Sequence, residues 1–413
     1  MQKKTTLNHR SLVRARRLMS AALVLSVMGN RLVEGGFDGL ASAGVISVAT
    51  VVAVSTFGEL TVILFPLYAR LLRGISPNWA LIGADVVEVA LSLLAVAGVL
   101  MLPAYTHVFI VGYVLLDLLV APVSDIADEF YGAGLAARSG NDALAFNATV
   151  DSMLAFFGFV VLAPLGSVIA AVSVLWLLAG NIVLSLLSIG SRLWSGSAFL
   201  LAAPRDEVDA EEYSAMGQRT PLSQFVHDLI HSGPASPLLS FAIQVAGALT
   251  GQLLFLWVAS LSSLSKYDAM ATVLLVFGLA ATLGPQVGRW MAQCSSSQVV
   301  LNLSAAVSCV LVCALAVSVW RGEVSFVLAL VFVFANVVVA RARMSVLSAH
   351  RQTYFSGSQF ERVMSWSYAF GGLGTMLGLQ LGYWLKVPHS PFIGLLCAAT
   401  IWLMVSFVRT SRH

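Results

Sequence analysis

The sequence predicts an all-α integral membrane protein with twelve transmembrane helices, from its composition and from the length of its apolar segments. Of its 413 residues, 58% are hydrophobic and 10% are charged, and the mean hydropathy is +0.88. A soluble domain usually carries about 25% charged residues and is less than half apolar. So much apolar surface requires lipid as its solvent. The two-residue alternation of a membrane β-barrel is absent, so helices are the expected spanning structure.

Twelve segments are long enough to cross a bilayer, which takes about 20 mostly apolar residues. The first six expected helices are Leu18–Leu40, Val45–Tyr68, Trp79–Leu102, Val108–Ala127, Ala145–Ser167 and Ile169–Leu187. The second six are Leu238–Ser260, Met270–Met291, Val299–Val319, Val324–Val346, Val363–Leu385 and Phe392–Phe407.

The longest polar stretch separates these two sets of helices. Its acidic residues are concentrated between 205 and 212, and an amphipathic pattern follows. Thr220 can cap a helix that begins at Pro221, and its apolar side chains fall on one face, which predicts a helix on the inner membrane surface. The expected organisation is a cytoplasmic tail over 1–17, a six-helix bundle over 18–188, a cytoplasmic linker over 189–237 and a second bundle over 238–413.

The basic residues predict how the chain is oriented. Six of them precede the first expected helix, which places the N-terminus in the cytoplasm because cytoplasmic segments are rich in lysine and arginine. Counting alternate loops from there puts all but four of the 23 lysines and arginines at the inner side. Lys266, Arg321 and Lys386 are left at the outer side, and Arg31 lies within the first helix. Both termini are therefore expected inside.

Three short motifs follow one another in the first half of the chain. Residues 26–30 read Ser-Val-Met-Gly-Asn, residues 84–88 read Ala-Asp-Val-Val-Glu, and residues 145–148 read Ala-Phe-Asn-Ala. With the six-plus-six layout, they resemble the major facilitator superfamily, in particular its exporter branch of enterobactin and macrolide efflux proteins. The second half matches mainly by hydropathy and spacing. The resemblance implies two rocking bundles in a bacterial cytoplasmic (inner) membrane.

The sequence departs from the superfamily at its inner gate. Arg73 stands about where the loop after the second helix normally carries an aspartate, and Glu88 stands where an arginine is common. The antiporter motif of the fifth helix, Gly-Pro-x-x-Gly-Gly, reads Ala-Pro-Leu-Gly-Ser over 163–167. We therefore expect a rewired gate, and the candidate gate residues are Glu59, Arg73, Asp85, Glu88 and Pro164.

Charged residues within the first helix point to a polar site inside the membrane. Arg31, Glu34 and Asp38 are spaced three and four residues apart, so they share a helix face. Ionisable groups in a bilayer are costly and usually face a cavity. The resemblance implies that helices one, four, seven and ten line that cavity. The resemblance also implies a buried pair between Arg31 and Asp117, which have nearly the same depth, with Glu34 and Asp38 on its outward side.

These charges can be read in two ways. A carboxylate that faces each side of the membrane in turn could carry a proton or bind substrate, with the neighbouring Asn30 in the same cavity. Alternatively, the charges form a static packing network, and Asp38 faces water where nearby glycines loosen the helix. The second half offers three candidate cavity amides, which could orient a substrate or simply pack: Gln244, Gln252 and Asn336.

The charges and the resemblance together predict a proton-coupled exporter, an antiporter, of a small amphipathic molecule such as a drug, siderophore or secondary metabolite. The excess of carboxylates favours cationic or zwitterionic cargo. We expect a monomer that binds protons, substrate and lipid, but no nucleic acid, metal or cofactor. No nucleotide-binding loop is present, so an ion gradient is the expected energy source rather than ATP. The alternatives are an importer or facilitator of the same fold, a transport-inactive sensor or assembly relative, and a membrane enzyme. We expect no enzyme, because no adequate catalytic constellation is found.

Overall fold

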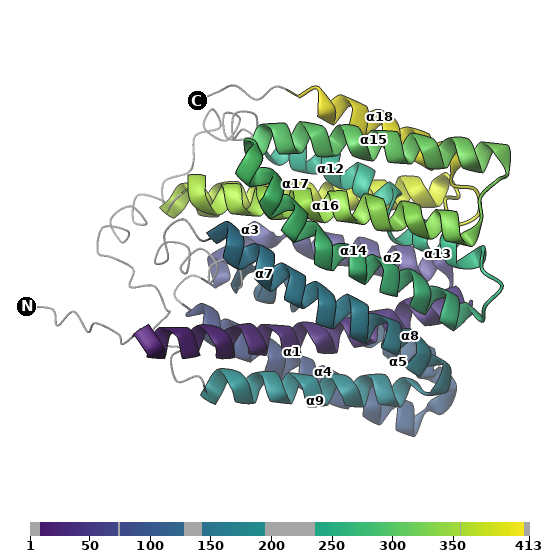
Figure 1. Ribbon diagram of the computed structural model, residues 1–413. Coiled ribbons are helices and arrows are strands. Elements are labelled where there is room, and N and C mark those ends of the chain that lie inside the picture. The colour runs from purple at the N-terminus through teal and green to yellow at the C-terminus, as the bar shows by residue number, and fades with distance from the viewer. Residues whose placement is uncertain (1–8, 73–74, 128–142, 195–235, 356, 409–413) are drawn as a thin grey trace, which may run out of the picture.

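The computed structural model describes residues 9–72, 75–127, 143–194, 236–355 and 357–408, and every regular element in these ranges is a helix (Figure 1). The first half contains α1 (His9–Ser42), α2 (Val48–Ile63), α3 (Phe65–Leu71), α4 (Pro77–Met101), η1 (Pro103–Tyr105), α5 (Thr106–Asp117), α7 (Ala143–Ala155), η2 (Phe156–Leu162), α8 (Ala163–Val172) and α9 (Val174–Trp194). The second half contains α12 (Pro237–Leu249), α13 (Gln252–Ser260), α14 (Lys266–Cys294), α15 (Ser297–Arg321), α16 (Phe326–Tyr354), α17 (Gly357–Trp384) and α18 (Phe392–Ser406).

Within the described residues, eight helices are long and apolar enough to cross a membrane, or nine if the pair α2 and α3, bent by 52°, is one span. Each of the twelve expected segments falls on helix, although α1 begins at His9, well before the expected Leu18, and α18 has only 15 residues. The chain is thus a multi-pass helical membrane protein. The count of twelve spans stays a prediction.

Serine caps fix where several helices begin. Ser47, Ser76 and Ser325 each accept a hydrogen bond from the backbone N–H three residues later. Such a cap satisfies one of the four N–H groups that a helix start leaves without a partner. These polar turns join the long apolar helices at the ends of the bundle.

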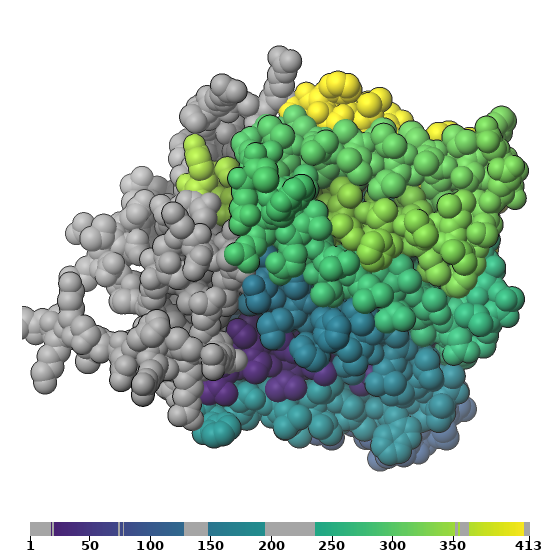
Figure 2. Space-filling model, in the orientation of Figure 1, coloured from purple at the N-terminus to yellow at the C-terminus, as the bar shows by residue number. Residues whose placement is uncertain are grey.

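The helices form two groups that meet along a seam, the first half below and the second half above in Figures 1 and 2. Within the first group α1 packs on α8 and α9, and within the second α12 packs on α17 and α14 on α16. Across the seam α17 packs on α2, and α14 packs on α7, η2 and α8. The α1 and α18 ends nearest the two termini lie at the same end of the bundle (Figure 1).

Glycines permit the closest of these contacts. A Cβ atom on Gly35 of α1 would overlap the backbone of Ala163, and one on Gly374 of α17 would overlap the carbonyl of Phe241 in α12. Without side chains at these positions the helix backbones approach each other closely, which favours association in lipid. The inner-surface helix expected after Pro221 lies outside the described residues, so the linker and the expected domain boundaries stay predictions.

Candidate functional site

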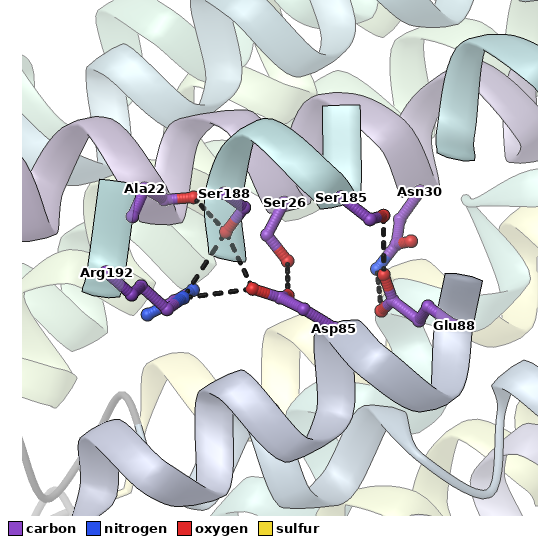
Figure 3. Close-up of polar contacts among 8 residues, drawn as sticks. All are labelled: Ala22, Ser26, Asn30, Asp85, Glu88, Ser185, Ser188 and Arg192. Atoms are coloured by element: carbon purple, nitrogen blue, oxygen red, sulfur yellow. Dashed lines mark hydrogen bonds and ion pairs between the residues drawn. The ribbon is translucent and has the colours of Figure 1, made fainter. Parts of the chain in front are cut away.

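A buried ion pair lies at the centre of a polar network in the first half (Figure 3). The Arg192 Nε of α9 lies 3.0 Å from the Asp85 Oδ2 of α4, and both side chains are almost fully buried, at 0% and 1% exposure. Ser26 of α1 donates to the other oxygen of Asp85 at 2.9 Å, and Ser188 of α9 donates to Oδ2 at 2.7 Å. A charge so deep in a protein is tolerated only when it is paired and hydrogen bonded.

The same three helices surround a second carboxylate. Asn30 of α1 donates to one oxygen of Glu88 at 3.1 Å, and Ser185 of α9 donates to the other at 3.3 Å. Figure 3 shows that Ser26 and Asn30 project from one face of α1 toward α4. Asp85 and Glu88 are thus bonded to partners within the first half, and their expected role in the gate stays a prediction.

Charged and polar residues from both halves form what we call the central cluster: Arg31, Glu34, Asp38, Asp117, Gln252 and Arg341. Arg31 makes its ion pair with Glu34, one turn further along α1. The expected pair of Arg31 with Asp117 is therefore a wrong prediction: a partner on the same helix face takes the guanidinium. Asp117 is still close enough for the charges of both residues to act on it, and its buried Oδ1 has no hydrogen-bond partner.

Gln252 joins the central cluster across the seam. Its Nε2 donates to Asp38 Oδ1 at 2.9 Å, and its Oε1 accepts from Ser55 of α2 at 2.8 Å. Asp38 therefore does not simply face water, and Gln252 is bonded to two helices of the opposite half. A second bond across the seam runs from Gln380 of α17 to Thr56 of α2 at 2.8 Å.

The second-half arginine of the cluster packs on aromatic rings. The Arg341 guanidinium lies over Phe159 of η2, 5.7 Å from the ring centre, and over Phe277 of α14 at 5.5 Å. Arg31 lies over the same Phe159 ring at 4.3 Å. Cations this close to a ring face are attracted by its quadrupole.

A local distortion of the helix positions Phe159. Residues Phe156–Leu162 form a π-helix, in which Ala163 N–H bonds to Gly158 O, five residues back. Pro164 follows directly and has no N–H to donate to the carbonyl four residues before it, which favours the wider turn. Pro164, a candidate gate residue, thus lies beside the element that carries Phe159.

Two side chains of the cluster keep accessible surface although α1 is packed among other helices. Arg31 is 33% exposed and Glu34 is 47% exposed. The charge of Glu34 acts on Asp38, on Asp117 and on Tyr113 of α5, so Glu34 lies near other polar groups of α1 and α5.

Other candidate residues are placed outside the cluster. Glu59 lies at the seam, where its backbone carbonyl faces Gly372 of α17, and its role in the gate stays a prediction. Gln244 lies against Gly371 of its own half. Asn336 is buried, and its Oδ1 has no hydrogen-bond partner. Arg73 lies outside the described residues.

Sequence reasoning missed several residues of these sites. Arg343, expected at the inner interface, is 2% exposed and lies over Trp402 of α18 at 4.1 Å. Arg192 was expected there too, but it reaches back to Asp85. Pro164, which cannot donate to the carbonyl four residues before it, was the available signal for the π-helix. No group of three His, Cys, Asp or Glu residues among the described residues could hold a metal ion.

The fold is similar to that of two solved structures. The human organic anion transporter MFSD10 (TETRAN) matches with a TM-score of 0.65 at 12% sequence identity, covering 95% of this chain and 98% of the transporter. A bacterial homologue of the iron transporter ferroportin, in its outward-facing state with soaked iron, matches with a TM-score of 0.61 at 15% identity, covering 95% and 99%. No family model matches the sequence, and neither does any curated protein. The likeness shows that the chain shares the fold of these two proteins.

Proposed function

We propose that this protein is a secondary active transporter that exports a small amphipathic organic molecule in exchange for protons. The observation that carries this proposal is the central cluster, where charged side chains of both halves converge among the long packed helices. Such residues are costly in lipid and usually mark the path of an ion or a substrate. In transporters built from two bundles, the substrate site lies between them, and rocking exposes it to each side in turn.

The contacts across the seam support alternating access. Polar bonds such as Asp38 with Gln252 can break and reform at little net cost, since water replaces the lost partner when one side opens. Glycines also form the contacts between α14 and η2 and between α17 and α2. Because glycine has no side chain to interlock with the opposite helix, the two halves can shift against each other at these contacts. One of the solved structures of this fold is an organic anion transporter and the other is a homologue of an iron transporter, which supports transport for this chain as well.

Protons are the proposed coupling ion, because the cluster holds more carboxylates than arginines. Glu34 is the proposed proton carrier, since it is the most exposed of the cluster's acidic side chains on α1 and pairs with Arg31. When Glu34 is protonated, the ion pair is lost and Arg31 is free to change partner. The proposed location is the bacterial cytoplasmic membrane, with both termini in the cytoplasm and no enzymatic activity.

Accumulation of a dye and drug panel in efflux-deficient bacteria tests this proposal. Cells that express the protein should retain less of at least one compound than cells with empty vector, and an uncoupler should abolish the difference. Higher retention in expressing cells would identify an importer instead. Equal retention of every compound, with the protein present in the membrane, would contradict the proposed export of amphipathic molecules.

A further inference from the structure

Two arginines from opposite halves of the chain share one aromatic ring. The guanidinium carbon of Arg31 lies 4.3 Å from the centre of Phe159, and that of Arg341 lies 5.7 Å from it. The two positive charges act on each other. Like charges repel most strongly where water is scarce, so this arrangement needs compensation.

The protein supplies the two arginines with different partners for their positive charges. Arg31 has Glu34 as its ion-pair partner, yet its Nε is buried without an acceptor. Arg341 packs on the rings of Phe159 and Phe277, and the opposite charge that acts on it is that of Asp151 in α7. A guanidinium has five N–H groups that require acceptors when they leave water. An anionic group near the shared ring could accept from both arginines.

The ring that the two arginines share is held firmly in place. Gly278 of α14 packs against the backbone of Phe159, so closely that a Cβ atom would overlap it. Phe277 meets the Phe159 ring edge to face at 4.7 Å, and Phe255 meets Phe277 at 5.5 Å. These three rings offer an apolar surface beside the two guanidinium groups. Single-turn π-helices such as η2 occur frequently at functional sites.

The other part of the central cluster has the opposite sign. Glu34 and Asp38 follow Arg31 along α1, and Asp117 of α5 lies within range of Glu34. Glu34 lies one turn beyond Arg31, roughly 4.5 Å along the axis, and Asp38 lies one turn further. A molecule whose anionic and cationic groups are adjacent would meet arginines on one side and carboxylates on the other.

We propose that Arg31 and Arg341 bind the anionic group of a zwitterionic substrate, whose apolar ring packs on Phe159 and whose cationic group faces Glu34 and Asp38. This inference rests on the proposed transport function and specifies its substrate class. Because the arginines come from different halves, one anionic group would be bonded to both bundles at once. Substrate binding would thereby favour the closed arrangement of the seam.

Four fluorescent probes that share a dansyl ring and differ in head group test this inference on the purified full chain. They are ε-dansyl-lysine (zwitterion), dansylglycine (anion), dansylcadaverine (cation) and dansylamide (neutral), and binding is followed by the rise in dansyl fluorescence. The zwitterion should bind most tightly. Arg341→Gln should weaken its binding by at least about tenfold, as expected for a lost charge-assisted hydrogen bond. The same variant should leave dansylcadaverine binding unchanged.

Three further variants separate recognition from folding. Arg341→Lys should keep part of the affinity for the zwitterion, because lysine retains the positive charge. Phe159→Leu should weaken the binding of every probe, because leucine keeps the apolar volume but removes the aromatic ring. Arg321→Gln, which removes an exposed arginine at the far end of α15, should change nothing. Wild-type protein that binds the cation as well as the zwitterion, or none of the probes, would overturn the inference.

The outcomes also separate this inference from the proposed function. Gradient-driven export in cells without head-group preference in the binding assay would leave the transport function standing and refute the zwitterion site. Head-group preference in the purified protein without export of any compound would support the zwitterion site and contradict the proposed export.

Discussion

The Gln252 Nε2 lies 2.9 Å from the Asp38 Oδ1, and this hydrogen bond joins the second half of the chain to α1. Nearby along α1, Ser42 donates to the carbonyl of Lys266 at 3.0 Å, which is a second bond across the same end of the seam. Ser55 also bonds to Gln252. These polar contacts at one end of the seam form only when the two halves are correctly positioned against each other.

Gln252→Glu should open this end of the seam. The substitution keeps the shape of the side chain but places a carboxylate against Asp38, and like charges at hydrogen-bond distance repel. In a chain whose native cysteines are replaced, a cysteine at Ser42 should react faster with a membrane-impermeant maleimide. Adding Asp38→Asn should restore the slow rate, because the amide can again bond to the carboxylate. Equal maleimide reaction rates in the parent chain, in Gln252→Glu and in the double variant with Asp38→Asn would contradict this prediction. They would show that the bond between Gln252 and Asp38 does not keep this end of the seam closed.

Arg192→Met should destabilise the protein strongly without a direct effect on substrate recognition. It leaves the carboxylate of Asp85 buried and unpaired, which costs about 3–5 kcal/mol. The thermal unfolding midpoint of the purified protein should fall well below that of wild type. Arg321→Met, at an exposed helix end, is the matched control and should stay close to wild type, since such surface changes are usually within about 0.5 kcal/mol. A wild-type midpoint for Arg192→Met would show that the pair is not needed.

Gly35→Ala should reduce stability because the added methyl group meets the backbone of Ala163. Overpacking of this kind costs about 1–3 kcal/mol. Gly83→Ala in α4 is the comparison, because nothing lies within 4 Å of the added atom. Because alanine has a higher helix propensity than glycine, Gly83→Ala should leave the stability of the protein unchanged or raise it by up to about 1 kcal/mol. Equal thermal stability of the two variants would contradict the close approach of α1 and α8.

Pro164→Ala should weaken zwitterion binding while leaving expression unchanged. It restores an N–H that can bond to the Val160 carbonyl, which favours a regular α-helix and turns Phe159 away from the two arginines. The measurement is the affinity of ε-dansyl-lysine for the purified variant. Pro103→Ala, in the exposed turn η1, is the control and should bind as wild type does. Unchanged affinity in Pro164→Ala would mean that the π-helix does not depend on this proline.

The positions of the helices could be predicted from hydropathy because lipid leaves a chain few alternatives to an apolar helix. The spacing of Arg31, Glu34 and Asp38 also fixed them on one helix face, and the ion pair between the first two confirms their proximity. Gln252 was named as a cavity candidate, and its contact with Asp38 is consistent with that hypothesis without testing transport.

The partners across the fold could not be predicted, because they depend on how helices rotate and pack. Asp85 and Arg192 are separated by 107 residues, and nothing in their local sequence links them. Arg341 was expected at the inner interface, since an arginine near a helix end can extend to water. Its position over Phe159 depends on the π-helix, whose extra residue per turn changes the direction of every side chain that follows.

Transport by membrane vesicles with an imposed pH gradient tests the central claim most directly. Inverted vesicles that contain the wild-type protein should take up the compound that it exports from cells, and proton release should accompany uptake. Glu34→Gln, present at the same level, should show neither uptake nor proton movement, because the ion pair with Arg31 can no longer be switched by a proton. Normal gradient-driven uptake by Glu34→Gln would contradict the role of the central cluster in coupling.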